Sequence, residues 1–153
     1  MAARASAAAQ PPIFLKIAPD LIEAELEDIA AEVVEKRIDG VIVSNTTISR
    51  PPLRSKHAGE AGGLSGGPLF GLSTQMLSRF RAAAAGRFAL VGVGGIASGA
   101  DAYAKIRAGA AAVQLYSALV FEGPGLVTAI KRDLAQRLHA DGFKSVSGAV
   151  GAN

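Results

Sequence analysis

Lys16 is a charged residue inside an otherwise apolar run, residues 13–18, which stops at Pro19. Burying an unpaired ammonium group costs free energy, so Lys16 needs an anionic or electron-rich partner. That partner could be a bound ligand or a neighbouring carboxylate in a salt bridge. Asp20 follows too closely on the same strand to be an obvious partner, which favours the ligand.

A second apolar run ends in Ser44, Asn45 and Thr46, and this change from apolar to polar is abrupt. An amide and a hydroxyl together provide both hydrogen-bond donors and acceptors. Such a pair could bind the edges of a planar polar heterocycle, and its alternative role is to cap the loop that follows.

The next two apolar runs end in Gly94-Gly95 and in Tyr116-Ser117. Glycine permits close approach of the backbone to a ligand, and barrels commonly bind phosphate at this edge of their last strands. A phosphorylated cofactor is the expected ligand. Taken alone, the Gly-Val-Gly-Gly motif fits a phosphate loop and a tight strand-to-helix turn about equally well.

A glycine-rich segment around Gly66, residues 62–69, precedes the second predicted helix. Successive backbone N–H groups in such a segment can form a nest for an anion or for ring carbonyl groups. The alternative is that the segment is only the hinge of a lid, because residues 48–71 form a loop too long to be a simple connection.

Four consecutive strand-helix units must position these residues. Strands that are apolar on both faces are typical of parallel sheets covered by helices. The predicted strands are residues 13–18, 40–45, 88–93 and 111–115, and the predicted helices are residues 21–36, 73–85, 100–108 and 125–140.

The polar residues fall at the carboxyl end of every predicted strand, as in a (β/α)8 barrel. We therefore predict an α/β fold in which four βα units form half of such a barrel over residues 12–153. A free-standing doubly wound sheet is the alternative. Residues 1–11 are expected to be a disordered leader, since they fit neither a signal peptide nor a membrane span. Asp20 is predicted to cap the first helix, and Ser98 or Asp101 the third.

The composition excludes several classes of function. The 153 residues suit one domain, and the net charge of +3 is scattered, which argues against a nucleic-acid surface. The absence of cysteine excludes disulfides, zinc knuckles and a catalytic thiol, and fits reducing cytosol. His57 and His139 lack a paired carboxylate or a second histidine at ligand spacing, so no metal site is predicted. Ser49 and Ser147 lack a recognisable base, so no hydrolase triad is predicted.

Five segments carry a family resemblance across nearly the whole chain from about Pro12. They are Leu-Lys-Ile-Ala-Pro-Asp-Leu (15–21), Val-Ser-Asn-Thr-Thr-Ile-Ser-Arg-Pro (43–51), Gly-Gly-Leu-Ser-Gly-Gly-Pro-Leu (62–69), Gly-Val-Gly-Gly-Ile (92–96) and Val-Gln-Leu-Tyr-Ser-Ala-Leu (113–119). Together they resemble the C-terminal half of class 2, quinone-dependent dihydroorotate dehydrogenase. The Ile-Ala-Pro-Asp and Ser-Asn-Thr-Thr segments resemble class 2 rather than the soluble class 1 enzymes.

The resemblance implies the last four units of a (β/α)8 barrel that oxidises dihydroorotate to orotate in pyrimidine biosynthesis, with FMN as cofactor and a membrane quinone as acceptor. It implies that Lys16 contacts the flavin ring and that Asn45 and Thr46 bind orotate. The remaining residues implied to bind FMN, the last of them around its phosphate, are Ser44, Gly66, Gly95, Tyr116 and Ser117.

The resemblance implies no catalytic base in this chain, because the family's catalytic serine lies in the first half of the barrel. The helices that form the quinone tunnel also lie outside the matched segments. The chain is therefore expected to be inactive alone and cytoplasmic, with peripheral association at the inner membrane expected only of the intact enzyme.

Two other functions remain open. The first is a non-catalytic half-barrel that self-associates to cover its exposed sheet edges and binds FMN or phosphate weakly. The second is an unrelated phosphate-binding barrel enzyme that shares the Gly-Val-Gly-Gly turn. The Ser-Asn-Thr-Thr segment argues against the second, because generic phosphate binding does not require it.

Overall fold

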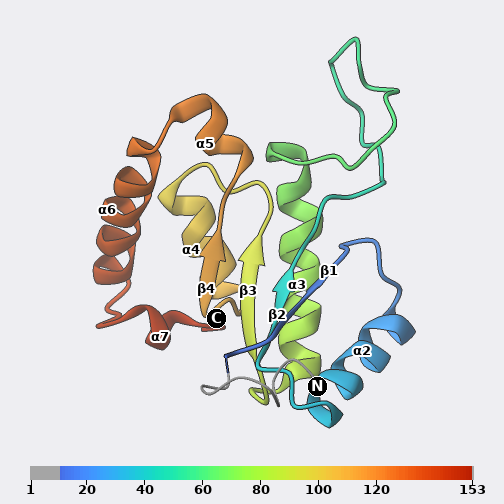
Figure 1. Ribbon diagram of the computed structural model, residues 1–153. Helices are drawn as coiled ribbons and strands as arrows, with labels where there is room; N and C mark the ends of the chain where they lie inside the picture. Colours follow the sequence, from blue (N-terminus) through green and yellow to red (C-terminus); the bar gives the residue numbers. More distant parts are fainter. Residues whose placement is uncertain (1–10, 153) are drawn as a thin grey trace.

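A four-stranded parallel sheet forms the centre of the computed structural model, which describes residues 11–152 (Figure 1). The strands lie in chain order, β1-β2-β3-β4, and each pairs in parallel with the next. All four carboxyl ends therefore meet at one edge of the sheet. The strands are β1 (Phe14–Ile17), β2 (Gly40–Val43), β3 (Ala89–Val93) and β4 (Ala112–Gln114).

Helices alternate with the strands, which confirms the predicted α/β fold of four consecutive βα units. The predicted helix at residues 73–85 begins three residues earlier, after a short 3-10 turn, and the structure adds two short helices, α5 and α7, that the sequence pattern did not predict. The helical elements are α2 (Glu23–Glu35), η1 (Gly67–Leu69), α3 (Phe70–Ala84), α4 (Gly99–Arg107), α5 (Ser117–Glu122), α6 (Gly125–Ala140) and α7 (Val146–Ala149).

The main core lies between one face of the sheet and helices α2 and α3. Alternate strand residues point to this face, as the two-residue period of a strand requires. The core side chains from the sheet include Ile17, Val41, Val43 and Leu90, and those from the helices include Leu26, Val33, Met76, Leu77 and Phe80. Smaller clusters join α4 to α6 and α7.

The opposite face of the sheet is more open. Phe14 is 40% exposed, and its ring covers Gly40, where an added Cβ would lie 2.5 Å from the Phe14 Cε1. Lys16 lies on the same face, since it is two residues further along β1, and it is paired in register with Ile42. The charged residue in the first strand therefore faces away from the helices.

The prediction that Asp20 caps the first helix is wrong. Helix α2 has Ile22 at its N-cap position, and Glu25 Oε2 accepts a 3.0 Å hydrogen bond from the Ile22 N–H. The Asp20 carboxylate instead accepts hydrogen bonds from the hydroxyls of Thr47 and Ser49, at 2.5 and 3.0 Å. The Asp20 carboxylate therefore binds a loop that is distant in sequence and does not bind the start of α2.

The predicted cap of the third helix is confirmed. Ser98 Oγ accepts from the Asp101 N–H at 3.1 Å, and the Asp101 carboxylate accepts in return from the Ala97 N–H at 3.0 Å. Apart from Pro11, the predicted leader lies outside the described residues. Across residues 11–152, no helix combines the length and apolar character needed to span a bilayer.

Candidate functional site

A cleft with a volume of about 600 Å³ lies at the carboxyl edge of the sheet. Its wall is built from the ends of all four strands and from the loops that follow them, because parallel strands bring these ends together. All eight residues that we predicted to bind a cofactor or substrate line this cleft: Lys16, Ser44, Asn45, Thr46, Gly66, Gly95, Tyr116 and Ser117.

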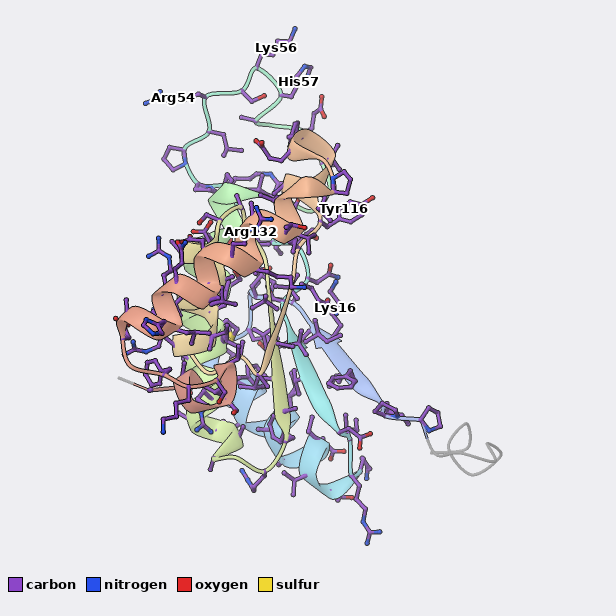
Figure 2. The ribbon with its side chains drawn as sticks, turned by 90° about the vertical axis from the view of Figure 1, so that its left-hand side faces the viewer. Lys16, Arg54, Lys56, His57, Tyr116 and Arg132 are labelled. Atoms are coloured by element: carbon purple, nitrogen blue, oxygen red, sulfur yellow. The ribbon has the colours of Figure 1, made fainter. Side chains whose placement is uncertain are left out.

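Lys16 reaches the cleft from the open face of β1. Its side chain is exposed, and Figure 2 shows Lys16 and Tyr116 on the same side of the molecule. Within residues 11–152, no carboxylate forms a salt bridge with Lys16, although six other ion pairs are present. The described structure therefore does not support the salt-bridge alternative.

Ser44, Asn45 and Thr46 form the wall beside Lys16. Ser44 is buried, and its hydroxyl donates to the Asn45 carbonyl at 2.9 Å. Asn45 Oδ1 accepts from the Thr46 N–H at 2.9 Å, so the side-chain oxygen caps the start of the loop. Asn45 and Thr46 are themselves exposed. The amide NH2 group of Asn45 and the hydroxyl of Thr46 are thus placed where a polar ligand can reach them.

The turn after β3 needs glycine both because it packs tightly on α3 and because it lines the cleft. Gly94 and Gly95 have φ angles of 104° and 74°, a region that L side chains rarely adopt. A Cβ added at Gly95 would lie 2.5 Å from the Cβ of Phe70, and one added at Gly94 would lie 2.8 Å from Ser73 Oγ. The turn therefore packs tightly on the first turn of α3, while both glycines also line the cleft.

The opposite wall comes from the segment before α3 and from α5. Ser117 Oγ donates to Ser65 Oγ at 3.0 Å, which links residues 52 positions apart. Gly66, with a φ of 76°, lies against Ser117, and no other heavy atom comes within 4 Å of a Cβ placed there. Tyr116 is 79% exposed and Phe121 is 84% exposed, so this wall is open to solvent.

The loop over residues 48–63 is closed at its base and projects from the end of the sheet (Figures 1 and 2). Thr47 and Leu64 form an antiparallel bridge with hydrogen bonds of 2.8 and 3.1 Å. Arg50 Nη2 donates to the carbonyl oxygens of Gly62 and Glu60, at 2.5 and 3.1 Å. The two ends of the loop are thus held together beside Thr46.

Asp20 supports the same loop from the neighbouring unit. Partial burial raises the pKa of its carboxyl, but hydrogen bonds from Thr47 and Ser49 and from the Ile48 and Ser49 amides outweigh this and hold the pKa below its ordinary value. Asp20 is therefore an ionised acceptor near neutral pH, which strengthens its hydrogen bonds.

His57 lies at the tip of the loop and has a carboxylate partner, contrary to our expectation. Its Nδ1 lies 2.6 Å from Glu60 Oε1, and both side chains are mostly exposed. Among residues 11–152, no group of three or more His, Cys, Asp or Glu side chains could hold a metal ion.

A comparison with known proteins matches this geometry to a family. A family model described as dihydroorotate dehydrogenase matches residues 1–138, which is most of the chain. The chain belongs to the dihydroorotate dehydrogenase family. This confirms the resemblance on which the site residues were assigned.

Relatives and solved structures agree with the family assignment. A dihydroorotate dehydrogenase (quinone) from Azorhizobium caulinodans is 64% identical over 148 residues, which cover 96% of this chain and 42% of that protein. A mitochondrial dihydroorotate dehydrogenase (quinone) from Oryza sativa subsp. japonica is 55% identical and covers 94% of this chain and 31% of that protein. The chain thus spans less than half the length of these relatives.

A crystal structure of a dihydroorotate dehydrogenase from Eimeria tenella in complex with ferulenol superposes with a TM-score of 0.90 at 44% identity. The match covers 93% of this chain and 38% of that one. Because dihydroorotate dehydrogenases have a TIM-barrel fold, the four βα units correspond to part of such a barrel.

Several residues that line the cleft were missed by sequence reasoning. Ser65, Phe121 and Glu122 are among them. The last two lie on α5, which has only six residues and is too short to show helical periodicity. Lys105 and Ser73, which lie behind the cleft, were also missed. Their hydrogen bond joins α4 to α3, and a local sequence pattern does not record contacts between two helices.

Proposed function

We propose that this chain provides the FMN-binding and orotate-binding part of an FMN-dependent, quinone-reducing dihydroorotate dehydrogenase. That enzyme oxidises dihydroorotate to orotate in pyrimidine biosynthesis. The observation that supports the proposal most strongly is the common location of eight residues, drawn from four separate units, along a single cleft. Parallel pairing brings the strand ends together, and the polar and glycine residues at those ends supply the groups that one ligand could bind.

The residues of the cleft fit FMN in size and chemistry. A volume of about 600 Å³ lies within the usual range for small-molecule sites. The wall offers one ammonium group, hydroxyl and amide groups, and backbone N–H groups at glycines. These groups suit a ligand that combines a planar polar ring with an anionic phosphate.

The lining residues divide into two groups by position. Lys16, Asn45 and Thr46 come from the first two units, and we assign the flavin ring and orotate to them. The Lys16 ammonium would stabilise negative charge on the ring. Gly95 and Ser117 come from the last two units, and with Gly66 and Tyr116 we assign them to the sugar-phosphate end of FMN. Buried Ser44 is assigned to the FMN side of the first group.

FMN, when bound, accepts the hydride that leaves dihydroorotate and passes the electrons on to quinone. Removal of the accompanying proton requires a base, and we assign that role to no residue of this chain. We propose that the catalytic serine belongs to the part of the enzyme beyond this chain. The proposed partners of the complete enzyme are dihydroorotate, orotate and a membrane quinone, and the proposal includes no nucleic acid.

The test is an FMN titration in which binding is measured by the quenching of flavin fluorescence. Lys16→Met keeps the apolar stem and removes the charge, so it should weaken binding of both FMN and riboflavin by about tenfold, the effect of losing a hydrogen bond to a charged group. Lys131→Met, an exposed residue of α6, is the control and should leave both affinities unchanged. Binding of FMN by Lys16→Met with unchanged affinity would remove Lys16 from the site.

Activity is tested by complementation. The chain is mixed with the N-terminal part of a related dihydroorotate dehydrogenase, and dihydroorotate-dependent dye reduction is recorded with and without FMN. Activity is expected only when both parts and FMN are present. A folded, FMN-loaded mixture without activity would contradict the proposal.

Self-association is a second candidate function, which one observation favours. The open sheet face carries Phe14 at 40% exposure, and sheets of parallel strands are normally covered on both faces. A second copy of the chain could cover this face. Light scattering measures the mass directly, and a well-folded monomer at high concentration would reject this candidate.

A further inference from the structure

Lys105 is a buried charged residue that does not line the cleft. It lies on α4, its exposed fraction is 0%, and it approaches the cleft only through other residues. Burial lowers the pKa of Lys105 to about 7, although the negative charge of Asp101 partly opposes this. Keeping an ammonium group here costs stability that an apolar side chain of similar length would not cost.

The hydrogen-bond and cation–π partners of Lys105 all belong to the first turn of α3. Its Nζ donates to Ser73 Oγ at 2.6 Å and reaches the Phe70 carbonyl at 3.5 Å. The same nitrogen lies 5.0 Å from the centroid of the Phe70 ring, within the range of a cation–π contact. The ammonium group therefore fixes α4 against the point where α3 begins.

Ser73 carries this contact to the glycine turn. The ammonium has only donors, so the Ser73 hydroxyl accepts from it and must direct its own single proton to a carbonyl. Three carbonyls lie within reach of that proton: Leu69 at 2.8 Å, Phe70 at 3.2 Å and Gly94 at 3.3 Å. Lys105, Ser73 and the carbonyls of Leu69 and Gly94 thus form one connected network directly behind the cleft wall.

The network lies where small displacements would alter the cleft. Leu69, Gly94 and Gly95 line the cleft, and the glycines approach α3 too closely to accept a Cβ. A shift of the glycine turn relative to α3 would change the separation between Gly95 and Gly66, the two sides that we assign to the phosphate end of FMN.

We propose that Lys105 is a positioning residue for the nucleotide site, which acts through Ser73 to hold the Gly94-Gly95 turn at a fixed place against the start of α3. This inference rests on the proposed FMN site for its effect on affinity. The position of the turn can also be measured without any ligand.

The affinity test compares FMN with riboflavin, which lacks the phosphate. Lys105→Met should weaken FMN binding by about tenfold and change riboflavin binding by less than about twofold, because the turn is assigned to the phosphate. Ser73→Ala should reproduce this result, and the double variant should be no weaker than either single variant, since both changes break one network. Lys131→Met is the control. Equal losses for the two flavins, or additive losses in the double variant, would overturn the proposal.

The ligand-free test is amide hydrogen exchange followed by NMR on the 153-residue chain. Lys105→Met should speed exchange at Gly94, Gly95 and Phe70 while leaving Val41 and Val43 in the core unchanged. Ser73→Ala provides the same test if Lys105→Met does not fold. Unchanged exchange at the glycine turn in a folded variant would overturn the proposal. If the wild-type chain binds no FMN while the variant still shows faster exchange at the turn, the result counts only against the proposed function.

Discussion

Replacing Lys105 by methionine should change how the stability of the chain depends on pH. Methionine keeps a long apolar side chain in the buried site and removes the ammonium group. The groups that face this ammonium are Ser73 Oγ, the Phe70 carbonyl and ring, and the carboxylate of Asp101. Burial dominates over the attraction of Asp101, so the folded chain holds this proton less tightly than the unfolded chain does.

The pKa of Lys105 falls from an ordinary 10.5 to about 7 in the folded chain. Between these two values the unfolded chain binds one more proton at this site than the folded chain does. Stability therefore rises with pH in this window, by up to about 1.4 kcal/mol per pH unit. From pH 7 to pH 9 the wild type should gain about 2 kcal/mol from this group alone, and Lys105→Met should gain nothing from the site.

The assay is urea denaturation, followed by circular dichroism at pH values from 6 to 9. The free energy of unfolding of the wild type minus that of Lys105→Met should increase steadily above pH 7, whereas the difference between the wild type and Lys131→Met should stay flat. This subtraction cancels other groups that titrate in the same range. A difference between the wild type and Lys105→Met that does not change with pH would refute the reasoning.

Three further predictions concern the walls of the cleft. Gly95→Ala should lower the free energy of unfolding by about 2 kcal/mol or more, because its φ is 74° and its new Cβ would lie 2.5 Å from the Phe70 side chain. The control is Gly125→Ala, where no heavy atom lies within 4 Å of the added Cβ and the free energy of unfolding should change by less than about 0.5 kcal/mol. Urea denaturation compares the two variants. Arg50→Ala should speed limited proteolysis of residues 51–62 without shifting thermal unfolding, since the guanidinium closes the base of that loop; equal cleavage rates would contradict this. Asp20→Asn should speed proteolysis of the same loop at neutral pH. In the wild type, acid should have the same effect as the pH falls through the lowered pKa of the Asp20 carboxyl in the folded chain. Equal cleavage rates of the wild type and Asp20→Asn at pH 7 would refute this.

The sequence predicts the sheet and the strand ends well because each strand carries its own signal. Apolar runs that change to polar residues mark both the strand and its carboxyl end, and parallel pairing then places these ends together. Lys16, Asn45 and Gly95 could therefore be assigned to one cleft from the sequence alone, and all three line it. Their roles in binding FMN and orotate remain predictions.

Other features depend on contacts that no local pattern records. Asp20 stands where a helix cap is expected, yet its carboxylate binds a loop that lies 27 residues away. Helix α5 is too short for periodicity, so Phe121 was missed although it lines the cleft. Lys105 shares the buried face of α4 with Ala102 and Ile106, but a lysine carries no apolar signal, and its contact with Ser73 of α3 appears only in the structure.

Hydrogen bonds between different units explain how a site made of four separate loops could act as one. Asp20 joins the first unit to Thr47 in the second, and Ser65 joins the second to Ser117 in the fourth, at 2.5 and 3.0 Å. The Lys105 network joins the second unit to the third. These bonds differ in burial: the Ser65–Ser117 bond is exposed, the Asp20–Thr47 bond is partly buried, and the Lys105–Ser73 bond is buried. Removing the exposed Ser65–Ser117 bond should therefore affect the geometry of the cleft more than global stability, because both serines line the cleft.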